Sequence, residues 1–447
     1  MICSTSRLAR LLNPLRQLGQ RTLYLNAYAL IGSNLLTAAA SYLFWILAAR
    51  RFTDEAVGIA SAMLSSMALL DVLASLGLES GLIRFLPTQE DVEASNHMLQ
   101  VATTLRLAAA LITTLAFIAG LSLWAPGLPS VSQANGLWML FVLLTLANGA
   151  YNLLNAAFIA LRKARYVFTG SLIFNTVKLG IVAVIPSATD APGVLTAVTV
   201  GLFSLVLIEL LVFLPALSAG FRPRLSLALQ SLRGFFNYSV VNQLADVLLG
   251  LPQMLLPLFV INTLGASANA RFYTAWMTAG VLRTACISIA QSAFAEGSAA
   301  VHQPGTLHTS IKHSLGLSLL ALLGGGGLLA VSGRWVLLLF GKSYSEEGTR
   351  LLYWLLVSVL PFSLMNLYLT TLRIRKQTAL LLAISAAWAT ISLSGTWLGM
   401  RAEGLTGIAM GWTIAQFTAL LLVIPLGMGE QAQIFQTKMT HREETVQ

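Results

Sequence analysis

The sequence consists of long apolar runs separated by short polar connections. Each run approaches the roughly 20 residues that an α-helix needs to cross the hydrocarbon core of a bilayer. The pattern therefore predicts twelve membrane-spanning helices. We expect them at residues 25–49, 56–84, 98–122, 136–160, 167–187, 194–216, 235–260, 268–297, 312–332, 350–371, 378–399 and 405–427. The longest connections hold on the order of 15 residues, which is too few for a separate domain outside the membrane.

The second half of the sequence repeats the layout of the first half. At an offset of 211 residues, Asn155 aligns with Asn366 and Arg162 aligns with Arg373. Each half holds an even number of spans, so both halves share one orientation and a pseudo-twofold axis along the membrane normal. Such a repeated all-α bundle with a central cleft suits alternating access. The expected parts are a basic cytoplasmic lead-in (1–24), an N-lobe (25–220), a C-lobe (221–428) and a cytoplasmic tail (429–447).

The composition agrees with an integral membrane protein. Hydrophobic residues make up 56% of the 447 positions and charged residues only 10%, against roughly 25% charged residues in soluble domains. With the N-terminus placed in the cytoplasm, the connections and termini on that side carry 17 Lys and Arg residues and the opposite side carries 7. This bias predicts that both termini are cytoplasmic. It also accounts for the net charge of +10 without a nucleic-acid partner.

Several kinds of chemistry are excluded by the sequence. Two cysteines are too few for a disulfide framework or a Cys-rich metal site. The Gly-Lys-Ser triplet at 341–343 is not a phosphate-binding loop, because Val336 stands where the first glycine of that motif is required. No catalytic constellation is recognisable, and no external loop is large enough for a glycosyltransferase or a ligase. We therefore predict a protein that is not an enzyme and that holds no cofactor or metal.

Charged side chains inside the predicted spans are the main candidates for function, because such residues are costly in a bilayer. The cations could bind phosphate or sugar acids of a substrate, or they could pair with the acids as structural ion pairs. Glu209 lies near a cytoplasmic helix end and favours a structural or interfacial role. For Asp246, ion coupling and helix packing stay open. Within the spans these residues are Arg106, Lys178 and Arg283 as cations, and Asp71, Glu209 and Asp246 as acids.

Two asparagines, Asn26 on the first span and Asn237 on the seventh, occupy matching positions of the two halves. Their amides could hydrogen-bond the hydroxyl groups of a sugar. Polar side chains in membrane helices more often bond neighbouring helices, and this alternative stays open.

Equivalent positions of the repeat carry opposite charges. At an offset of 212 residues, Asp71 aligns with Arg283 and Arg84 aligns with Glu296. We expect Asp71 and Arg283 to form a gating or ion-coupling pair when the cleft closes, which an anionic substrate would open by competing for Arg283. Because Asp71 and Arg84 lie on different faces of one helix, the second pair is expected near the headgroups unless the helix bends near Gly77 or Gly81.

Five segments resemble a known family. They are AARRFTDEAVGIASA, LASLGLESGLIRF, LPLFVINTLGASANARFYTAW, SAFAEGS and LLLFGKSYSEEGTRLLYWLL. Together the chain resembles the O-antigen-type polysaccharide flippases of the multidrug/oligosaccharidyl-lipid/polysaccharide exporter superfamily. The resemblance implies two six-helix lobes that form a V-shaped cleft lined by spans 1, 2, 7 and 8. It also implies translocation of an undecaprenyl-pyrophosphate-linked oligosaccharide across the bacterial cytoplasmic membrane, in polysaccharide or lipopolysaccharide biosynthesis.

The partners expected from this resemblance are the lipid-linked oligosaccharide and the bilayer. Other membrane proteins of polysaccharide assembly, and coupling to sodium or protons, are further expectations. The alternatives within the superfamily are a cation-coupled multidrug exporter and a peptidoglycan-precursor flippase. From other classes, a membrane glycosyltransferase or ligase lacks the loop that it would need, and a passive scaffold would not need charges inside its spans.

Overall fold

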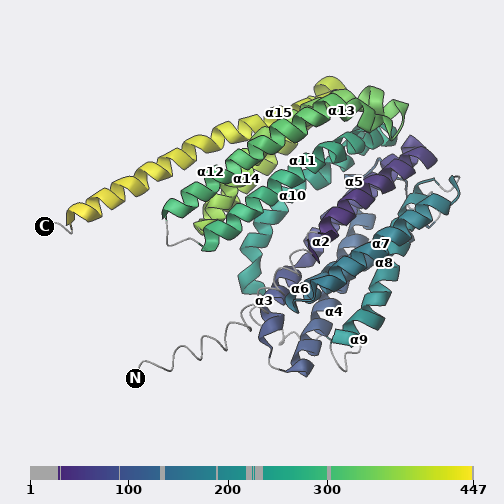
Figure 1. The fold of residues 1–447 in the computed structure, drawn as a ribbon. Helices are drawn as coiled ribbons and strands as arrows, with labels where there is room; N and C mark the ends of the chain where they lie inside the picture. Colours follow the sequence, from purple (N-terminus) through teal and green to yellow (C-terminus); the bar gives the residue numbers. More distant parts are fainter. Residues whose placement is uncertain are drawn as a thin grey trace. The chain divides into compact units, whose positions relative to one another are not determined.

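The computed structural model describes residues 29–30, 32–89, 91–130, 136–187, 190–217, 224, 226, 235–299 and 304–444. Regular structure in these residues is helical throughout, which confirms the all-α prediction (Figure 1). Contacts within the chain define two compact units. Unit 1 comprises residues 1–56 and 67–240, and unit 2 comprises residues 57–66 and 241–447. The V-shaped cleft and the lobe boundaries stay predictions.

The helices of the first half begin with an unlabelled one, Gly32–Arg51. They continue with α2 (Asp54–Ser75), α3 (Leu78–Phe85), a 3₁₀ turn (Leu86–Thr88), α4 (Val92–Ala119), α5 (Leu121–Trp124), α6 (Leu137–Ala160), α7 (Ala164–Val184), α8 (Asp190–Ile208), a π-helical turn (Glu209–Phe213) and α9 (Leu214–Leu217). The second half contains α10 (Phe235–Leu264), α11 (Ala266–Ala299), α12 (Pro304–Ala321), a π-helical turn (Leu322–Gly326), α13 (Gly327–Leu338), α14 (Lys342–Ile374) and α15 (Thr378–Glu444).

In the described part of the chain, ten helical segments are long and apolar enough to span a membrane. One of them, Thr378–Val423, contains non-helical backbone at Glu403 and Gly404, so it comprises two helices joined by a tight turn. The helix α11 has 34 residues but is not among the ten, because it is richer in polar and small side chains. The described helices thus overlap all twelve ranges predicted from hydropathy.

The structure differs from the prediction of one continuous helix at 56–84. The helix α2 ends at Ser75, and the backbone enters the left-handed region at Leu76 (φ 50°) and Gly77 (φ 74°). A left-handed conformation is common for glycine but unfavourable for leucine. The helix α3 restarts at Leu78 with a new direction, which brings the side chain of Glu79 back toward that of Asp71. A bend near Gly77 or Gly81 was the exception named for that prediction, and the break lies at Leu76 and Gly77.

Unit 1 is organised around α6, which packs against α4 on one side and α8 on another, while α7 packs against α8. Its apolar core includes the fully buried side chain of Phe158. Rings from three segments meet there, because Phe158 on α6 contacts Tyr166 on α7 and Phe213 in the π-helical turn at centroid distances of 5.7 and 6.3 Å. These contacts hold the end of α8 against α6 and α7.

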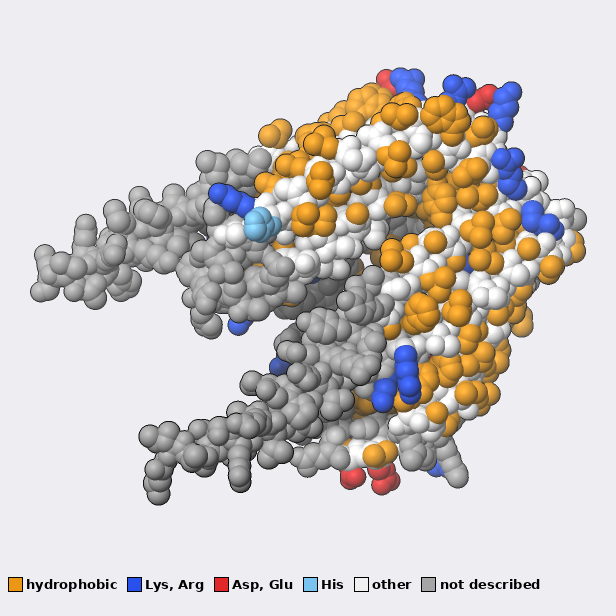
Figure 2. Space-filling model, viewed as in Figure 1, with side chains coloured by type: hydrophobic (Ala, Val, Ile, Leu, Met, Phe, Trp, Pro, Cys, Tyr) orange, Lys and Arg blue, Asp and Glu red, His pale blue; other side chains and the backbone are white. Residues whose placement is uncertain are grey.

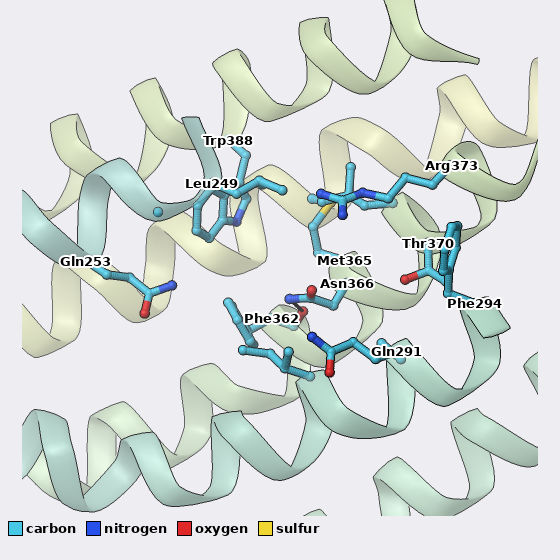
Figure 3. Close-up of a pocket in the computed structure, with 14 residues that line it drawn as sticks. Leu249, Gln253, Gln291, Phe294, Phe362, Met365, Asn366, Thr370, Arg373 and Trp388 are labelled. Carbon is cyan, nitrogen blue, oxygen red and sulfur yellow. Dashed lines mark hydrogen bonds between the residues drawn. The ribbon is translucent and has the colours of Figure 1, made fainter. Parts of the chain in front are cut away.

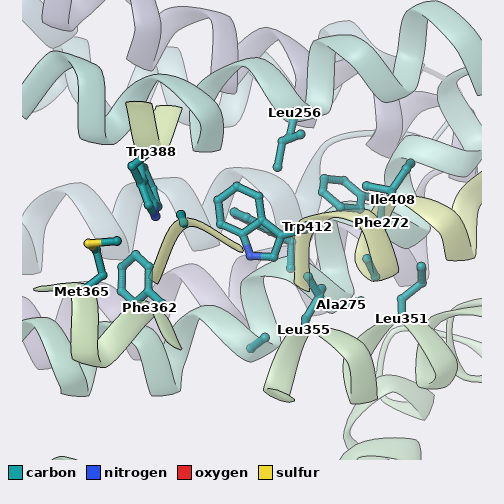
Figure 4. Close-up of a cluster of buried hydrophobic side chains, with 14 of the residues drawn as sticks. Leu256, Phe272, Ala275, Leu351, Leu355, Phe362, Met365, Trp388, Ile408 and Trp412 are labelled. Atoms are coloured by element: carbon teal, nitrogen blue, oxygen red, sulfur yellow. The ribbon is translucent and has the colours of Figure 1, made fainter. Parts of the chain in front are cut away.

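Unit 2 is organised around α14, which packs against α11, α13 and α15. Its core is rich in tryptophan (Figure 4). The indole of Trp412 is fully buried and meets Trp276 and Trp388 edge to face, with centroids 4.9 and 6.0 Å apart. Edge-to-face geometry is a favourable arrangement for aromatic rings. The indole nitrogen Nε1 of Trp388 donates to Oε1 of Gln416 at 2.9 Å, which fixes the orientation of Trp388.

Glycines allow the two halves of α15 to touch backbone to backbone. A Cβ atom added to Gly399 would lie 2.1 Å from the carbonyl oxygen of Gly407, and one added to Gly411 would lie 2.2 Å from that of Gly395. Contacts this close require residues without side chains, the usual device for tight helix packing in membranes. The pattern identifies the segments on either side of Gly404 as an antiparallel helical hairpin.

A second close crossing joins the 57–66 segment of α2 to α11 within unit 2. A Cβ atom on Gly58 would lie 1.8 Å from the carbonyl oxygen of Ala266. Beside it, Nδ2 of the fully buried Asn269 donates to the Gly58 carbonyl at 2.8 Å and to Oγ of Ser61 at 3.0 Å. Small and polar residues thus form this interface.

Hydrophobic side chains cover most of the described surface seen in Figure 2, and charged side chains interrupt it at few places. Large apolar residues are strongly exposed along several helices, including Leu211 at 66% and Val331 at 71%. A surface of this kind is suited to contact with lipid tails rather than water. The protein is therefore a multi-pass membrane protein.

Candidate functional site

A charged cluster lies inside unit 1, where α2, α3, α4 and α6 meet. The guanidinium of Arg106 on α4 is fully buried and pairs with Asp71 on α2 through Nη2, while its Nε lies 3.0 Å from Oε1 of Glu79 on α3. Nδ2 of Asn152 on α6 donates to the other oxygen of Asp71 at 2.9 Å. One cation therefore faces two carboxylates.

Local backbone geometry explains why this cluster can form. The left-handed residues Leu76 and Gly77 turn the chain so that Glu79 lies beside Arg106. Gly149 on α6 borders the guanidinium, since a Cβ atom there would be in ordinary van der Waals contact with Cζ of Arg106, at 3.5 Å. The carboxylates of Asp71 and Glu79 keep 20% and 22% of their side-chain surface exposed. The cluster is thus only partly open.

The contacts in this cluster bear on the roles that the sequence predicts for its members. Arg106 was a candidate for substrate binding, with a structural ion pair as the alternative; in the structure it pairs with Asp71. Asp71 contacts Arg106 and Asn152 in this structure, so its gating role with Arg283 stays a prediction. Sequence reasoning missed Glu79 and Asn152 as partners.

Lys178, the second predicted cation, lies on α7 with 4% of its surface exposed. Its ammonium Nζ is 3.4 Å from Oγ of Ser41 and lies over the rings of Phe44 and Phe174, 5.2 and 4.7 Å from their centroids. Among the described residues, no carboxylate forms a salt bridge with it. Hydroxyl and ring contacts stabilise an ammonium without neutralising it.

Arg283, the third predicted cation, lies on α11 in unit 2 and is 6% exposed. Its guanidinium carbon Cζ lies 3.7 Å from the centroid of the Trp276 ring, and Nη2 donates to the Trp276 carbonyl at 3.4 Å. Within the described part of the chain it forms no salt bridge. A stacked guanidinium of this kind keeps donors for an anionic ligand, so substrate binding by Arg283 stays a prediction.

The remaining predicted site residues are less informative. Arg84 is exposed at the end of α3 and lies over the ring of Phe85, 5.5 Å from its centroid. Asn26 lies outside the described residues. Three others stand on α10 or α11, but their side chains lie outside the described part of the structure: Asn237, Asp246 and Glu296.

A cavity of about 260 Å³ lies in unit 2 between α10, α11, α14 and α15 (Figure 3). Its polar lining consists of Gln253 from α10, Gln291 from α11, and Asn366, Thr370 and Arg373 from α14. Its apolar lining includes the aromatic side chains of Phe294, Phe362 and Trp388. Helices on several sides therefore direct amides, a hydroxyl and one guanidinium into a single space with aromatic walls.

This lining suits a ligand with many hydroxyl groups and a negative charge. Amide side chains both donate and accept hydrogen bonds, as sugar hydroxyls do. The guanidinium of Arg373 presents a planar donor set that matches phosphate or carboxylate oxygens. The indole of Trp388, held by Gln416, offers a rigid apolar wall. Sequence reasoning used Asn366 and Arg373 only as markers of the repeat and did not assign them to a binding site.

In the described part of the chain, no three His, Cys, Asp or Glu side chains lie close enough together to hold a metal ion.

Comparison with known proteins decides the family. The sequence profile described as polysaccharide biosynthesis protein matches residues 23–294. The chain belongs to this family. A comparison with curated protein sequences finds no match. The matched region covers unit 1 from residue 23 onward and, in unit 2, the 57–66 segment, α10 and α11 up to residue 294.

Solved structures of low sequence identity share the fold. An inward-facing multidrug resistance MATE family transporter of the MOP superfamily matches with a TM-score of 0.72 at 12% identity, covering 90% of this chain and 96% of that one. The lipid II flippase MurJ in an inward closed conformation matches at 0.66 and 12% identity, covering 89% and 86%. A MOP superfamily transporter from Pyrococcus furiosus matches at 0.62 and 13% identity, covering 92% and 95%. The resemblance to this superfamily is thereby confirmed at the level of the fold.

Proposed function

We propose that this protein is a flippase that moves a lipid-linked oligosaccharide across the bacterial cytoplasmic membrane by alternating access, without chemical change to the substrate. The observation that carries the proposal is the cavity of unit 2, where amides, Arg373 and Trp388 converge in a protein of the polysaccharide biosynthesis family. A substrate with sugar hydroxyls and a phosphate group has the functional groups that this lining can bind.

The finer form of the proposal names the substrate as an undecaprenyl-pyrophosphate-linked repeat unit of an O-antigen type. Arg373 lies one residue before the end of α14, on the side of the membrane that the charge bias assigns to the cytoplasm. A pyrophosphate bound there would meet the guanidinium at the leaflet in which lipid-linked sugars are assembled. Arg283, stacked on Trp276, is a second cation for the same anionic substrate.

A cation-coupled drug exporter is the second candidate, because one structural neighbour is a multidrug resistance transporter. The lining of the cavity argues against a drug exporter. Its aromatic walls could attract a cation, but the charged side chain of the lining is Arg373, which repels one.

The test uses purified full-length protein in proteoliposomes with a short-chain, fluorescent polyprenyl-pyrophosphate oligosaccharide as the probe. Arg373→Gln should slow transfer between leaflets about tenfold to a hundredfold, since a hydrogen bond to a charged group contributes about 1.5–3 kcal/mol. Gln291→Leu should slow it less, because a neutral hydrogen bond contributes less. The control is Arg375→Gln, which removes an exposed cation from the residue after α14.

Equal transfer rates for Arg373→Gln and Arg375→Gln would exclude the cavity as the substrate site. Ethidium efflux without transfer of the lipid-linked probe would favour the drug exporter instead.

A further inference from the structure

The cavity of unit 2 is small compared with an oligosaccharide. Its volume of about 260 Å³ equals that of about nine water molecules in the liquid, at about 30 Å³ each. Pockets that take drug-sized ligands hold roughly 300–1,000 Å³. The cavity therefore has room for one sugar ring with its substituents but not for a chain of sugars, so the other rings of an oligosaccharide must lie outside it.

The amides that line this cavity are not used to hold helices together. Within the described part of the chain, the side chains of Gln253 and Gln291 form no hydrogen bond to protein groups. Asn366 uses only its nitrogen Nδ2, which donates to the Phe362 carbonyl of its own helix at 3.4 Å. By contrast, Gln416 in the tryptophan-rich core beside the cavity has both ends of its amide bonded. The amides of the cavity are thus available to a ligand.

These polar groups are spread along the cavity (Figure 3). Gln253 and Trp388 lie at one end and Arg373 enters from the other end, while Gln291 and Asn366 point into the space between them. Asn366 and Arg373 are seven residues apart on α14, which places their backbones about 10 Å apart. An anion bound by the guanidinium and a ring bound by the amides can therefore be neighbouring parts of one small ligand.

An acetamido substituent on a sugar ring has hydrogen-bonding groups that match these amides. Its planar amide directs the N–H and the C=O in opposite directions, so the two groups need partners from different sides. Oδ1 of Asn366 on α14 can accept from the N–H, and the NH₂ group of Gln291 on α11 can donate to the C=O. The methyl group suits the apolar side chains of Phe362 and Met365 in the lining. A hydroxyl group in the same place would satisfy fewer of these partners.

We propose that the cavity of unit 2 binds one sugar ring of the substrate, the ring that carries the phosphate, and that it selects a ring with an acetamido substituent. This inference rests on the proposed function, because the lipid-linked oligosaccharide supplies both the sugar and the phosphate. The indole face of Trp388 packs against the C–H groups of the ring, and Arg373 binds the phosphate. Sugars farther from the lipid are not recognised in this cavity.

The experiment measures binding to the purified full-length protein in lipid nanodiscs by saturation-transfer NMR. The probes are N-acetylglucosamine 1-phosphate, glucose 1-phosphate, N-acetylglucosamine and glucuronic acid. N-acetylglucosamine 1-phosphate should bind about tenfold more tightly than glucose 1-phosphate, because the acetamido group adds hydrogen bonds. It should bind about tenfold to a hundredfold more tightly than N-acetylglucosamine, which has no phosphate for Arg373.

Asn366→Leu should remove the preference for the acetamido group while glucose 1-phosphate still binds. The matched control is Asn262→Leu, which changes an amide on α10 outside the lining of the cavity. Asn262 lies about 13 Å along that helix from Gln253, so this variant should keep the full preference.

Equal binding of N-acetylglucosamine 1-phosphate and glucose 1-phosphate by the unmodified protein would overturn the proposal, whether or not the variants fold. So would the absence of binding by all the probes. Tighter binding of glucuronic acid would identify a carboxylate as the anion and would overturn it as well. A preference that a folded Asn366→Leu protein retains would contradict the assignment to this cavity.

Transfer in proteoliposomes separates this proposal from the proposed flippase activity. Two lipid-linked probes differ only in the first sugar, which is N-acetylglucosamine in one and glucose in the other. Below saturation the first should cross about tenfold faster, and exchanging the outermost sugar should have no effect. Equal transfer of both probes would overturn the acetamido preference and leave the flippase activity intact. Selective binding without transfer of either probe would instead contradict the flippase activity.

Discussion

Replacing Arg106 by methionine tests whether the charged cluster of unit 1 holds α2, α3 and α4 together. The change keeps the apolar stem but leaves Asp71 and Glu79 without their cation. Removing one partner of a buried ion pair costs about 3–5 kcal/mol. Because the two carboxylates are 20% and 22% exposed, water relieves part of the penalty. The expected loss is therefore near the lower end, about 3 kcal/mol.

The triple variant Arg106→Met, Asp71→Asn, Glu79→Gln removes the carboxylates as well. Without isolated charges, the site should lose only about 1 kcal/mol, since replacing a whole buried ion pair by neutral groups is often close to neutral. The difference of about 2 kcal/mol corresponds to a factor of about 30 in the ratio of folded to unfolded protein. Unfolding by SDS in mixed micelles, followed by tryptophan fluorescence, measures these differences.

The control is Arg84→Met, which removes an exposed cation from α3 and should change stability by no more than about 0.5 kcal/mol. Two results would refute the reasoning. Arg106→Met could prove as mild as Arg84→Met, which would mean that the cluster is solvated. The triple variant could prove as unstable as the single one, which would mean that the shape of the arginine, not its charge, matters.

Two further predictions concern the helical hairpin and the topology. Gly411→Leu should prevent the hairpin of α15 from forming, because a Cβ atom there would lie 2.2 Å from the Gly395 carbonyl oxygen. The control Gly316→Leu should fold normally, because a Cβ atom there meets nothing within 4 Å; size-exclusion chromatography of the purified variants shows whether each is monodisperse. The topology test starts from a protein in which both native cysteines are replaced by serine. Ser343→Cys should then react with a membrane-impermeant maleimide added to intact cells, and Gly220→Cys should not. The reverse labelling pattern would show that the orientation is opposite to the predicted one.

Hydropathy alone locates the membrane helices, because the cost of exposing polar backbone to lipid outweighs local preferences. It does not locate the break in the second span. Leu76 adopts a left-handed conformation, which is rare for leucine and therefore cannot be predicted from the residue type. Gly77 by itself is compatible with a continuous membrane helix. The turn at Gly404 is predictable, because polar residues separate two apolar runs there.

The site is only partly visible in the sequence. Charges inside spans draw attention to Asp71 and Arg106, but their pairing joins residues 35 positions apart and depends on the break after Ser75. In the sequence, the residues that line the cavity of unit 2 stand out by no charge except that of Arg373 at a helix end. Its amides, such as Gln253 and Gln291, resemble the polar residues that membrane helices use to bond one another. Only their convergence from different helices makes the cavity a candidate site.

The buried charged groups differ in the contacts that compensate them. Arg106 has two carboxylate partners, so the free-energy cost of burying its charge is largely offset within unit 1. Lys178 and Arg283 have aromatic faces instead, and Glu209 has no hydrogen-bond partner in the described part of the chain. A ring face attracts a cation but leaves its charge intact, and an unpaired acid gains nothing for stability from its position. Charges in a bilayer are costly, and in the proposed function Arg283 has a use for its charge, because its guanidinium would face the anionic substrate.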